Sequence, residues 1–75
     1  MIIKILGSGC RKCMMLGENA KAAAAAAGRE AELIKVTDFA EIAAYGVMST
    51  PGLVIDERLV STGRVLSAEE IGKLL

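Results

Sequence analysis

The chain of 75 residues contains no histidine, and this absence limits the chemistry available to it. A cysteine–histidine pair of the protease type is excluded, and the usual nitrogen ligand of metal ions is missing. Nine basic and nine acidic residues give a formal charge of zero, so the sequence shows no electrostatic footprint for nucleic acid. Long apolar runs and a signal-peptide pattern are also lacking. We therefore expect a soluble, cytoplasmic protein that binds neither nucleic acid nor a membrane.

Cysteine is scarce, and its two copies lie close together in the sequence. Cys10 and Cys13 are separated by two residues. A disulfide that closes so short a loop removes little entropy from the unfolded chain, so the pair is not a structural crosslink. In a cytoplasmic protein an isolated CxxC pair indicates redox chemistry or metal binding.

The remaining sequence predicts alternating strands and helices within a single domain, residues 1–75. Strands are expected at 2–6, 31–36, 53–56 and 58–61, and helices at 13–27, within 37–46 and at 67–75. Six consecutive alanines, 22–27, favour a helix that can lie close to a sheet, because their side chains are small. The order is strand, helix, strand, helix, strand, strand, helix, beginning as in a βαβ unit.

Several local signals define where these elements begin and end. Asp38 with Glu41, and Ser67 with Glu70, are each expected to form a capping box at a helix start. The last two strands are separated by a two-residue polar turn at 56–57, which suggests a hairpin although it lacks the favoured Asn-Gly sequence. The spacing in the last helix predicts one apolar face formed by Ile71, Leu74 and Leu75.

The position of the cysteines at a helix start assigns them different roles. The helix dipole and the cations of Arg11 and Lys12 should lower the pKa of Cys10, although these two side chains could equally be ordinary solvated residues. Cys10 lies at the edge of a glycine-bearing loop, whereas Cys13 is one turn inside the helix and should be more covered. We expect Cys10 to attack a substrate disulfide and Cys13 to resolve the mixed disulfide.

Metal binding is the main alternative for this pair. Two thiolates together with Met14, Met15 or Met48 would suit Cu(I), and two chains could supply four thiolates to Zn(II). Methionines beside a helix start are more often core residues than ligands, and this favours the redox interpretation, with no metal and no other cofactor. A structural domain with inert thiols is the third possibility.

A second motif extends the comparison to a known family. "GCRKC" at residues 9–13, after the first strand, and "STPG" at 49–52, before a later one, together resemble the thioredoxin superfamily. The whole chain is similar to its minimal thioredoxin-like or glutaredoxin-like members, of the type called redox-active disulfide protein 2. Arg11 and Lys12 stand where the motif of thioredoxin itself has Gly-Pro.

This resemblance implies both a fold and an activity. The fold would be an α/β thioredoxin-like one, a four-stranded mixed sheet with three flanking helices. Thr50 and Pro51 would form a cis peptide opposite the disulfide and bind the substrate backbone by strand addition. The activity would be thiol–disulfide oxidoreduction, either protein disulfide reduction or electron relay. The implied partners are disulfide-containing protein substrates and a flavin-containing electron donor of the thioredoxin reductase type.

Overall fold

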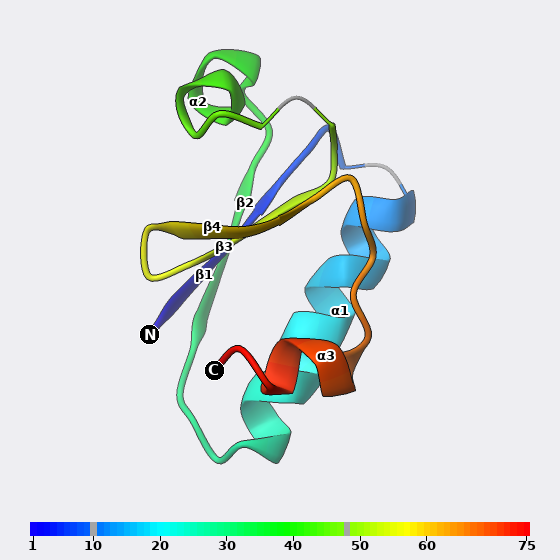
Figure 1. The fold of residues 1–75 in the computed structure, drawn as a ribbon, viewed down its shortest axis with the longest axis vertical. Coiled ribbons are helices and arrows are strands. Elements are labelled where there is room, and N and C mark those ends of the chain that lie inside the picture. Colours follow the sequence, from blue (N-terminus) through cyan, green and yellow to red (C-terminus); the bar gives the residue numbers. More distant parts are fainter. Residues whose placement is uncertain (10, 48) are drawn as a thin grey trace.

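A four-stranded sheet forms the centre of the molecule in our computed structural model, which describes residues 1–9, 11–47 and 49–75 (Figure 1). In chain order the elements are β1 (Ile2–Leu6), α1 (Arg11–Ala26), β2 (Glu32–Val36), α2 (Phe39–Ala44), β3 (Gly52–Ile55), β4 (Arg58–Thr62) and α3 (Ala68–Gly72). The strand order across the sheet is β2-β1-β3-β4. β1 and β2 are parallel, whereas β1–β3 and β3–β4 are antiparallel. The predicted element order and the mixed sheet are therefore confirmed.

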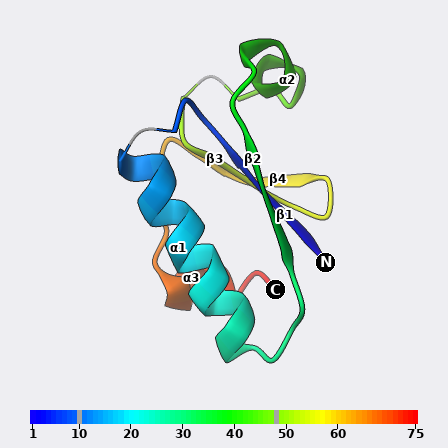
Figure 2. The same ribbon diagram turned by 180° about the vertical axis from the view of Figure 1, so that it is seen from behind.

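Helices α1 and α3 cover one face of the sheet, where the larger core lies (Figure 2). The side chains of Ile3 and Leu53 point from the strands toward Leu16 of α1 and Ile71 of α3, and each of these is at most 1% exposed. Ala20 and Ala23 of α1 are also buried. Their small side chains let the helix approach the sheet closely, as the alanine-rich sequence predicts.

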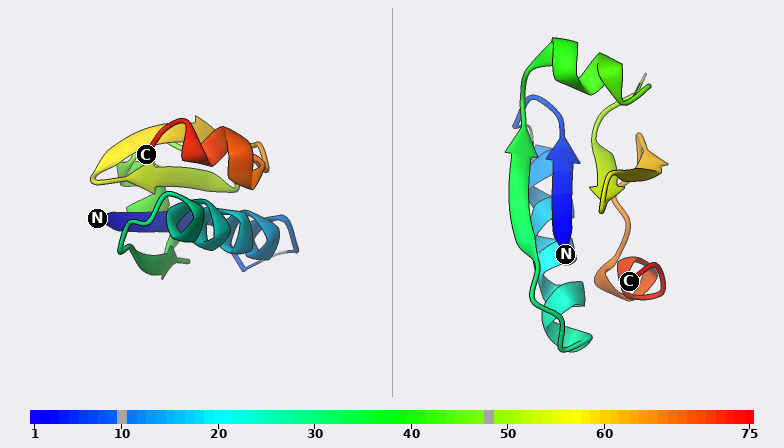
Figure 3. Two further views of the ribbon diagram at one scale, coloured as in Figure 1. Left: turned by 90° about the horizontal axis from the view of Figure 1, so that it is seen from below. Right: turned by 90° about the vertical axis from the view of Figure 1, so that its left-hand side faces the viewer.

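The other face is covered only at one end, by the short helix α2. Its Ile42 packs with apolar side chains from β1, β2 and β3 and from the segment after α2: Leu6, Val36, Val54 and Val47. Figure 3 shows α2 beyond the ends of β1 and β2 and far from α3. In the described part of the chain, no helix is long and apolar enough to cross a membrane.

The helix ends follow the sequence signals with one exception. Helix α1 ends in a Schellman motif, in which Gly28 N donates to Ala25 O (3.1 Å) and Arg29 N donates to Ala24 O (3.0 Å). The capping box of Ser67 and Glu70 at α3 is confirmed. At α2, by contrast, Asp38 and Glu41 do not form the predicted capping box.

There Asp38 Oδ1 accepts a hydrogen bond from Ala40 N (3.0 Å), the second helical residue, and forms a simple N-cap instead.

The predicted apolar face of the last helix is also partly wrong. Ile71 is buried and Leu75 packs against the core, but Leu74 is 47% exposed. Because α3 ends at Gly72, the helical spacing no longer holds beyond it.

The hairpin between β3 and β4 is confirmed. Its turn forms without the favoured Asn-Gly sequence. Asp56 and Glu57 both have positive φ (48° and 67°), as in a type I′ turn. Asp56 is held by β1, since Ile2 N donates to its Oδ1 (2.9 Å) and its own amide donates to Ile2 O (2.8 Å). Contacts to the neighbouring strand thus compensate for an unfavourable turn sequence.

Candidate functional site

The candidate site lies where the chain leaves β1 and enters α1. Cys13 is the third residue of α1 and is 5% exposed, as expected for the more covered cysteine. The other predicted cysteine, Cys10, lies outside the described residues, as does Met48. Cys13 and the surroundings of its sulfur therefore define the geometry of the site.

Gly7 brings Cys13 close to the second predicted motif. A Cβ atom on Gly7 would overlap with Cys13 Sγ and would lie 3.7 Å from Thr50 Cβ. The absence of a side chain thus lets Cys13 and Thr50 approach Gly7 together. The sequence indicated Gly7 only as the end of a strand, because this close approach depends on how distant segments pack.

The Thr50–Pro51 peptide bond is cis, as the resemblance implies. Pro51 is fully buried, whereas Thr50 is exposed. Gly63 holds this segment in place, since its amide donates a 2.8 Å hydrogen bond to Pro51 O. A Cβ on Gly63 would come within 2.9 Å of Ser49 Cβ. Sequence reasoning missed Gly63 as a supporting residue, and a glycine directly after the last strand was the available signal.

The charged residues and the two methionines in the first turns of α1 are exposed. Arg11 and Lys12 take part in no ion pair within residues 1–9, 11–47 and 49–75. Their exposure agrees with either interpretation of these cations, so their tuning role stays a prediction. Met14 and Met15 are 56% and 49% exposed, so the expectation that they are core residues is wrong.

Nothing in the described residues adds to the metal interpretation. Among them, no group of three or more histidine, cysteine, aspartate or glutamate side chains could hold a metal ion. The sulfur ligands considered from the sequence include Cys10 and Met48, which lie outside this part of the chain.

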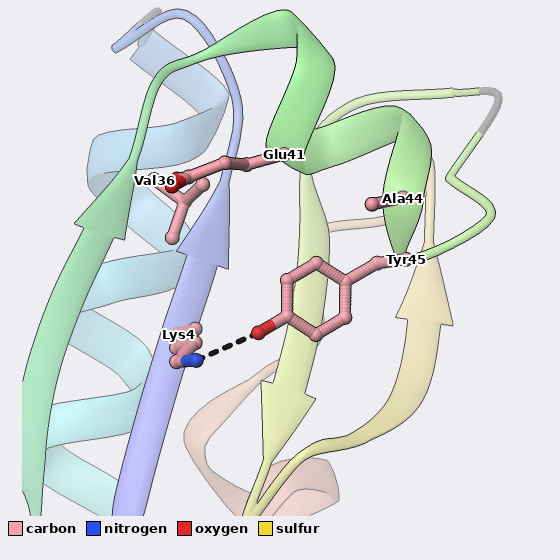
Figure 4. A pocket seen from close by; sticks show the side chains of 5 residues that line it. All are labelled: Lys4, Val36, Glu41, Ala44 and Tyr45. Carbon is pink, nitrogen blue, oxygen red and sulfur yellow. Dashed lines mark hydrogen bonds between the residues drawn. The ribbon is translucent and has the colours of Figure 1, made fainter.

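A separate polar cluster lies on the face that α2 covers, beside a cavity of about 300 Å³ (Figure 4). Lys4 Nζ donates hydrogen bonds to Tyr45 OH (2.6 Å) and Glu57 Oε1 (2.7 Å), and Tyr45 OH donates to Glu57 Oε2 (3.2 Å). The bond to Glu57 is the main reason that the pKa of Lys4 is raised, and the bond from Lys4 likewise lowers the pKa of Glu57. This cluster ties together β1, α2 and the hairpin turn.

A mixed four-stranded sheet with a buried cysteine at the start of a helix, packed beside a cis-proline segment, defines a protein of thioredoxin-like fold. Residues 1–75 match a family model described as a thioredoxin domain. The chain is 45% identical to a thioredoxin of Methanocaldococcus jannaschii over 71 residues, which cover 95% of this chain and 81% of that protein. It is 43% identical to a thioredoxin of Methanothermobacter thermautotrophicus over 75 residues, which cover 100% of this chain and 97% of that protein.

The chain therefore belongs to the thioredoxin family. Membership supports thiol–disulfide oxidoreduction as the general class of activity.

Proposed function

We propose that this protein is a small thiol–disulfide oxidoreductase that reduces protein disulfides or relays electrons between dithiols. The observation that carries the proposal is the approach of Cys13 and Thr50 to Gly7. It brings the second cysteine of the CxxC motif beside a cis peptide bond whose exposed residue a substrate can reach. The family relationship supports the same chemistry.

The proposed reaction uses the two cysteines in sequence. The Cys10 thiolate attacks one sulfur of a substrate disulfide, which breaks that bond and releases the first substrate thiolate. A mixed disulfide between Cys10 and the substrate results. The Cys13 thiolate then attacks the Cys10 sulfur, releases the second substrate thiolate and closes the Cys10–Cys13 disulfide. Two electrons thus pass to the substrate, and its two thiolates take up protons from the solvent and the protein.

The segment Thr50–Pro51 is proposed to orient the substrate. Pro51 is buried and its carbonyl oxygen already accepts a hydrogen bond from Gly63, whereas Thr50 is exposed. The backbone of Thr50 is therefore the part of this segment available to an extended substrate strand. Arg11 and Lys12 would stabilise the thiolate of Cys10 as nearby cations.

The oxidised protein must be reduced again after each turnover. We propose a flavin-containing reductase of the thioredoxin reductase type as electron donor and disulfide-containing proteins as substrates. A reducing cycle of this kind belongs in the cytoplasm, where thiols are kept reduced. The oxidised protein, which carries the Cys10–Cys13 disulfide, is the form that would leave the substrate and be reduced by the donor.

Trapping of the mixed disulfide tests this proposal. The reduced Cys13→Ser variant should form a covalent complex with a disulfide-containing protein such as insulin. This complex should be visible on a non-reducing gel, and dithiothreitol should separate it into its two proteins. The Cys10→Ser variant should form none, and the double variant is the matched control. Full turnover by Cys10→Ser would overturn the proposal. One equivalent of bound metal with both thiols shielded from alkylation would favour metal carriage instead.

A further inference from the structure

A cavity of about 120 Å³ lies directly beside Cys13, between the first turn of α1 and the ends of β1 and β2. It is lined by Ile5, Gly7, Gly9, Cys13, Met14, Lys35 and Thr37. A single water needs only roughly 10–15 Å³ by a comparable measure, so several waters fit. Three of the lining residues, Cys13, Lys35 and Thr37, carry a polar group of the kind that such waters require, and Lys35 and Thr37 are exposed. The cavity therefore has room for a small group of waters beside Cys13.

Lys35 reaches this cavity because of its register in the sheet. It pairs with Ile5 in the parallel ladder of β1 and β2, and Ile5 belongs to the core beneath α1. Lys35 thus lies on the face that α1 covers, while its neighbours Ile34 and Val36 pack on the other face.

Of the described residues that line the cavity, only Lys35 carries a charge. The other charged residues of α1, β1 and β2 are not among those that line the cavity. Arg11 and Lys12 are exposed on α1 and do not line the cavity, and Lys4 of β1 is bound to Glu57. Asp38, after β2, caps α2 through Ala40 N. Among the described residues, Lys35 is therefore the charged residue that shares this cavity with Cys13.

We propose that Lys35 is a positioning residue for Cys13: its ammonium group stabilises the Cys13 thiolate across the cavity that both residues line. The inference rests on the proposed role of Cys13 as the resolving thiol. Burial disfavours a thiolate, and Cys13 lies among apolar residues of the larger core. A cation that reaches the same cavity offsets this effect, so the attack of Cys13 on the mixed disulfide becomes faster near neutral pH.

A coloured aromatic disulfide, dithiobis-nitrobenzoate, separates the two steps in one experiment. Attack by Cys10 releases the first aryl thiolate, and attack by Cys13 on the resulting mixed disulfide releases the second. The variant Lys35→Met keeps a long apolar stem and removes the charge, and Lys35→Arg restores the charge. Lys21→Met makes the same charge change on the exposed surface of α1, and Lys21 is not among the residues that line this cavity.

We expect Lys35→Met to slow the second release about fivefold to tenfold at neutral pH and to move the midpoint of its pH profile upward by about 0.7–1 unit. The first release should change less than about twofold, which also controls for binding of the anionic reagent. Lys35→Arg and Lys21→Met should behave like the unaltered protein. A second release that is unchanged in Lys35→Met at every pH would overturn the inference.

A measurement without turnover keeps the two proposals distinguishable. In Cys10→Ser protein, the ultraviolet absorbance of the Cys13 thiolate can be titrated with and without Lys35→Met. The variant should raise the midpoint of this titration, and equal midpoints would overturn the role of Lys35. Failure of the unaltered protein to release a second aryl thiolate would count instead against the proposed function.

Discussion

The amide of Gly63 donates a 2.8 Å hydrogen bond to the carbonyl oxygen of Pro51. This bond joins the residue after β4 to the cis Thr50–Pro51 segment, which packs beside Cys13 through Gly7. Gly63 has a positive φ of 67°, a conformation that residues with a side chain adopt at a cost. The position of the proline segment therefore depends on Gly63, a glycine with no described contact to Cys13.

Replacing Gly63 by alanine should destabilise the protein and disturb the proline segment. The new Cβ would come within 2.9 Å of Ser49 Cβ, and the positive φ would add strain. We expect unfolding in urea to show a loss of about 2–3 kcal/mol, together with slower mixed-disulfide formation. Gly28→Ala is the control, because Gly28 has nearly the same φ (66°) but open space around it. It should lose only about 1 kcal/mol, and equal losses would contradict the packing argument.

Two further glycines should respond to alanine with opposite signs. At Gly7 the Cβ would overlap with Cys13 Sγ, so Gly7→Ala should cost about 1–3 kcal/mol and slow the step carried out by Cys13. At Gly17, inside α1, the Cβ would make ordinary contacts at 3.7 Å and 3.8 Å with Leu33 and Ile5. Gly17→Ala should therefore stabilise the protein by about 0.5–1 kcal/mol through helix propensity. Urea unfolding of both variants measures the difference, and a stabilising Gly7→Ala would refute the assigned contact.

The element order could be predicted from the sequence because each element carries its own local signal. The capping box at Ser67 and the alanine-rich helix before Gly28 depend on neighbours within one or two turns. The exposure of Met14 and Met15 was predicted wrongly, since it depends on which side of α1 the sheet covers. The end of α3 at Gly72 likewise exposes Leu74, although its spacing fits an apolar face.

The candidate site was predictable only in part for the same reason. The CxxC pair and Pro51 are visible as motifs, but their meeting at Gly7 is a tertiary contact. Gly63 and Lys35 are each separated by more than ten residues from the groups that they support. No pattern in one sequence indicates that the side chain of Lys35 shares a cavity with Cys13, because this follows from the register of β2 against β1.

The capping box at α3 should contribute measurably to stability. Glu70 N donates to Ser67 Oγ (3.1 Å), and Ser67 N donates to Glu70 Oε1 (3.2 Å). Ser67→Ala should cost about 1 kcal/mol in urea unfolding, because α3 holds the fully buried Ile71 against the core. Glu69→Gln changes a carboxylate in the same turn without touching the box and should have a smaller effect. A Ser67→Ala variant as stable as the unaltered protein would show that α3 does not depend on its cap.

The cluster of Lys4, Tyr45 and Glu57 should make stability depend on pH in a defined window. The hydrogen bond from Lys4 lowers the pKa of Glu57 in the folded protein. An acid with a lowered folded pKa stabilises the fold above its unfolded pKa of about 4.3, and this contribution is lost as the pH falls through the folded value. The raised pKa of Lys4 has the opposite sense: its contribution is complete below the unfolded pKa of about 10.4 and is lost at higher pH.

Glu57→Gln tests this dependence while leaving the shape of the turn side chain almost unchanged. The stability difference between the unaltered protein and the variant should be constant from about pH 6 to 9 and should shrink toward zero below about pH 4. Because the Glu57 side chain is 65% exposed, added salt should reduce the difference. Glu30→Gln serves as the control, since Glu30 takes part in no ion pair in the described part of the chain. A difference that persists unchanged to about pH 3 would mean that the contribution of Glu57 comes from its hydrogen-bonding shape and not from its charge.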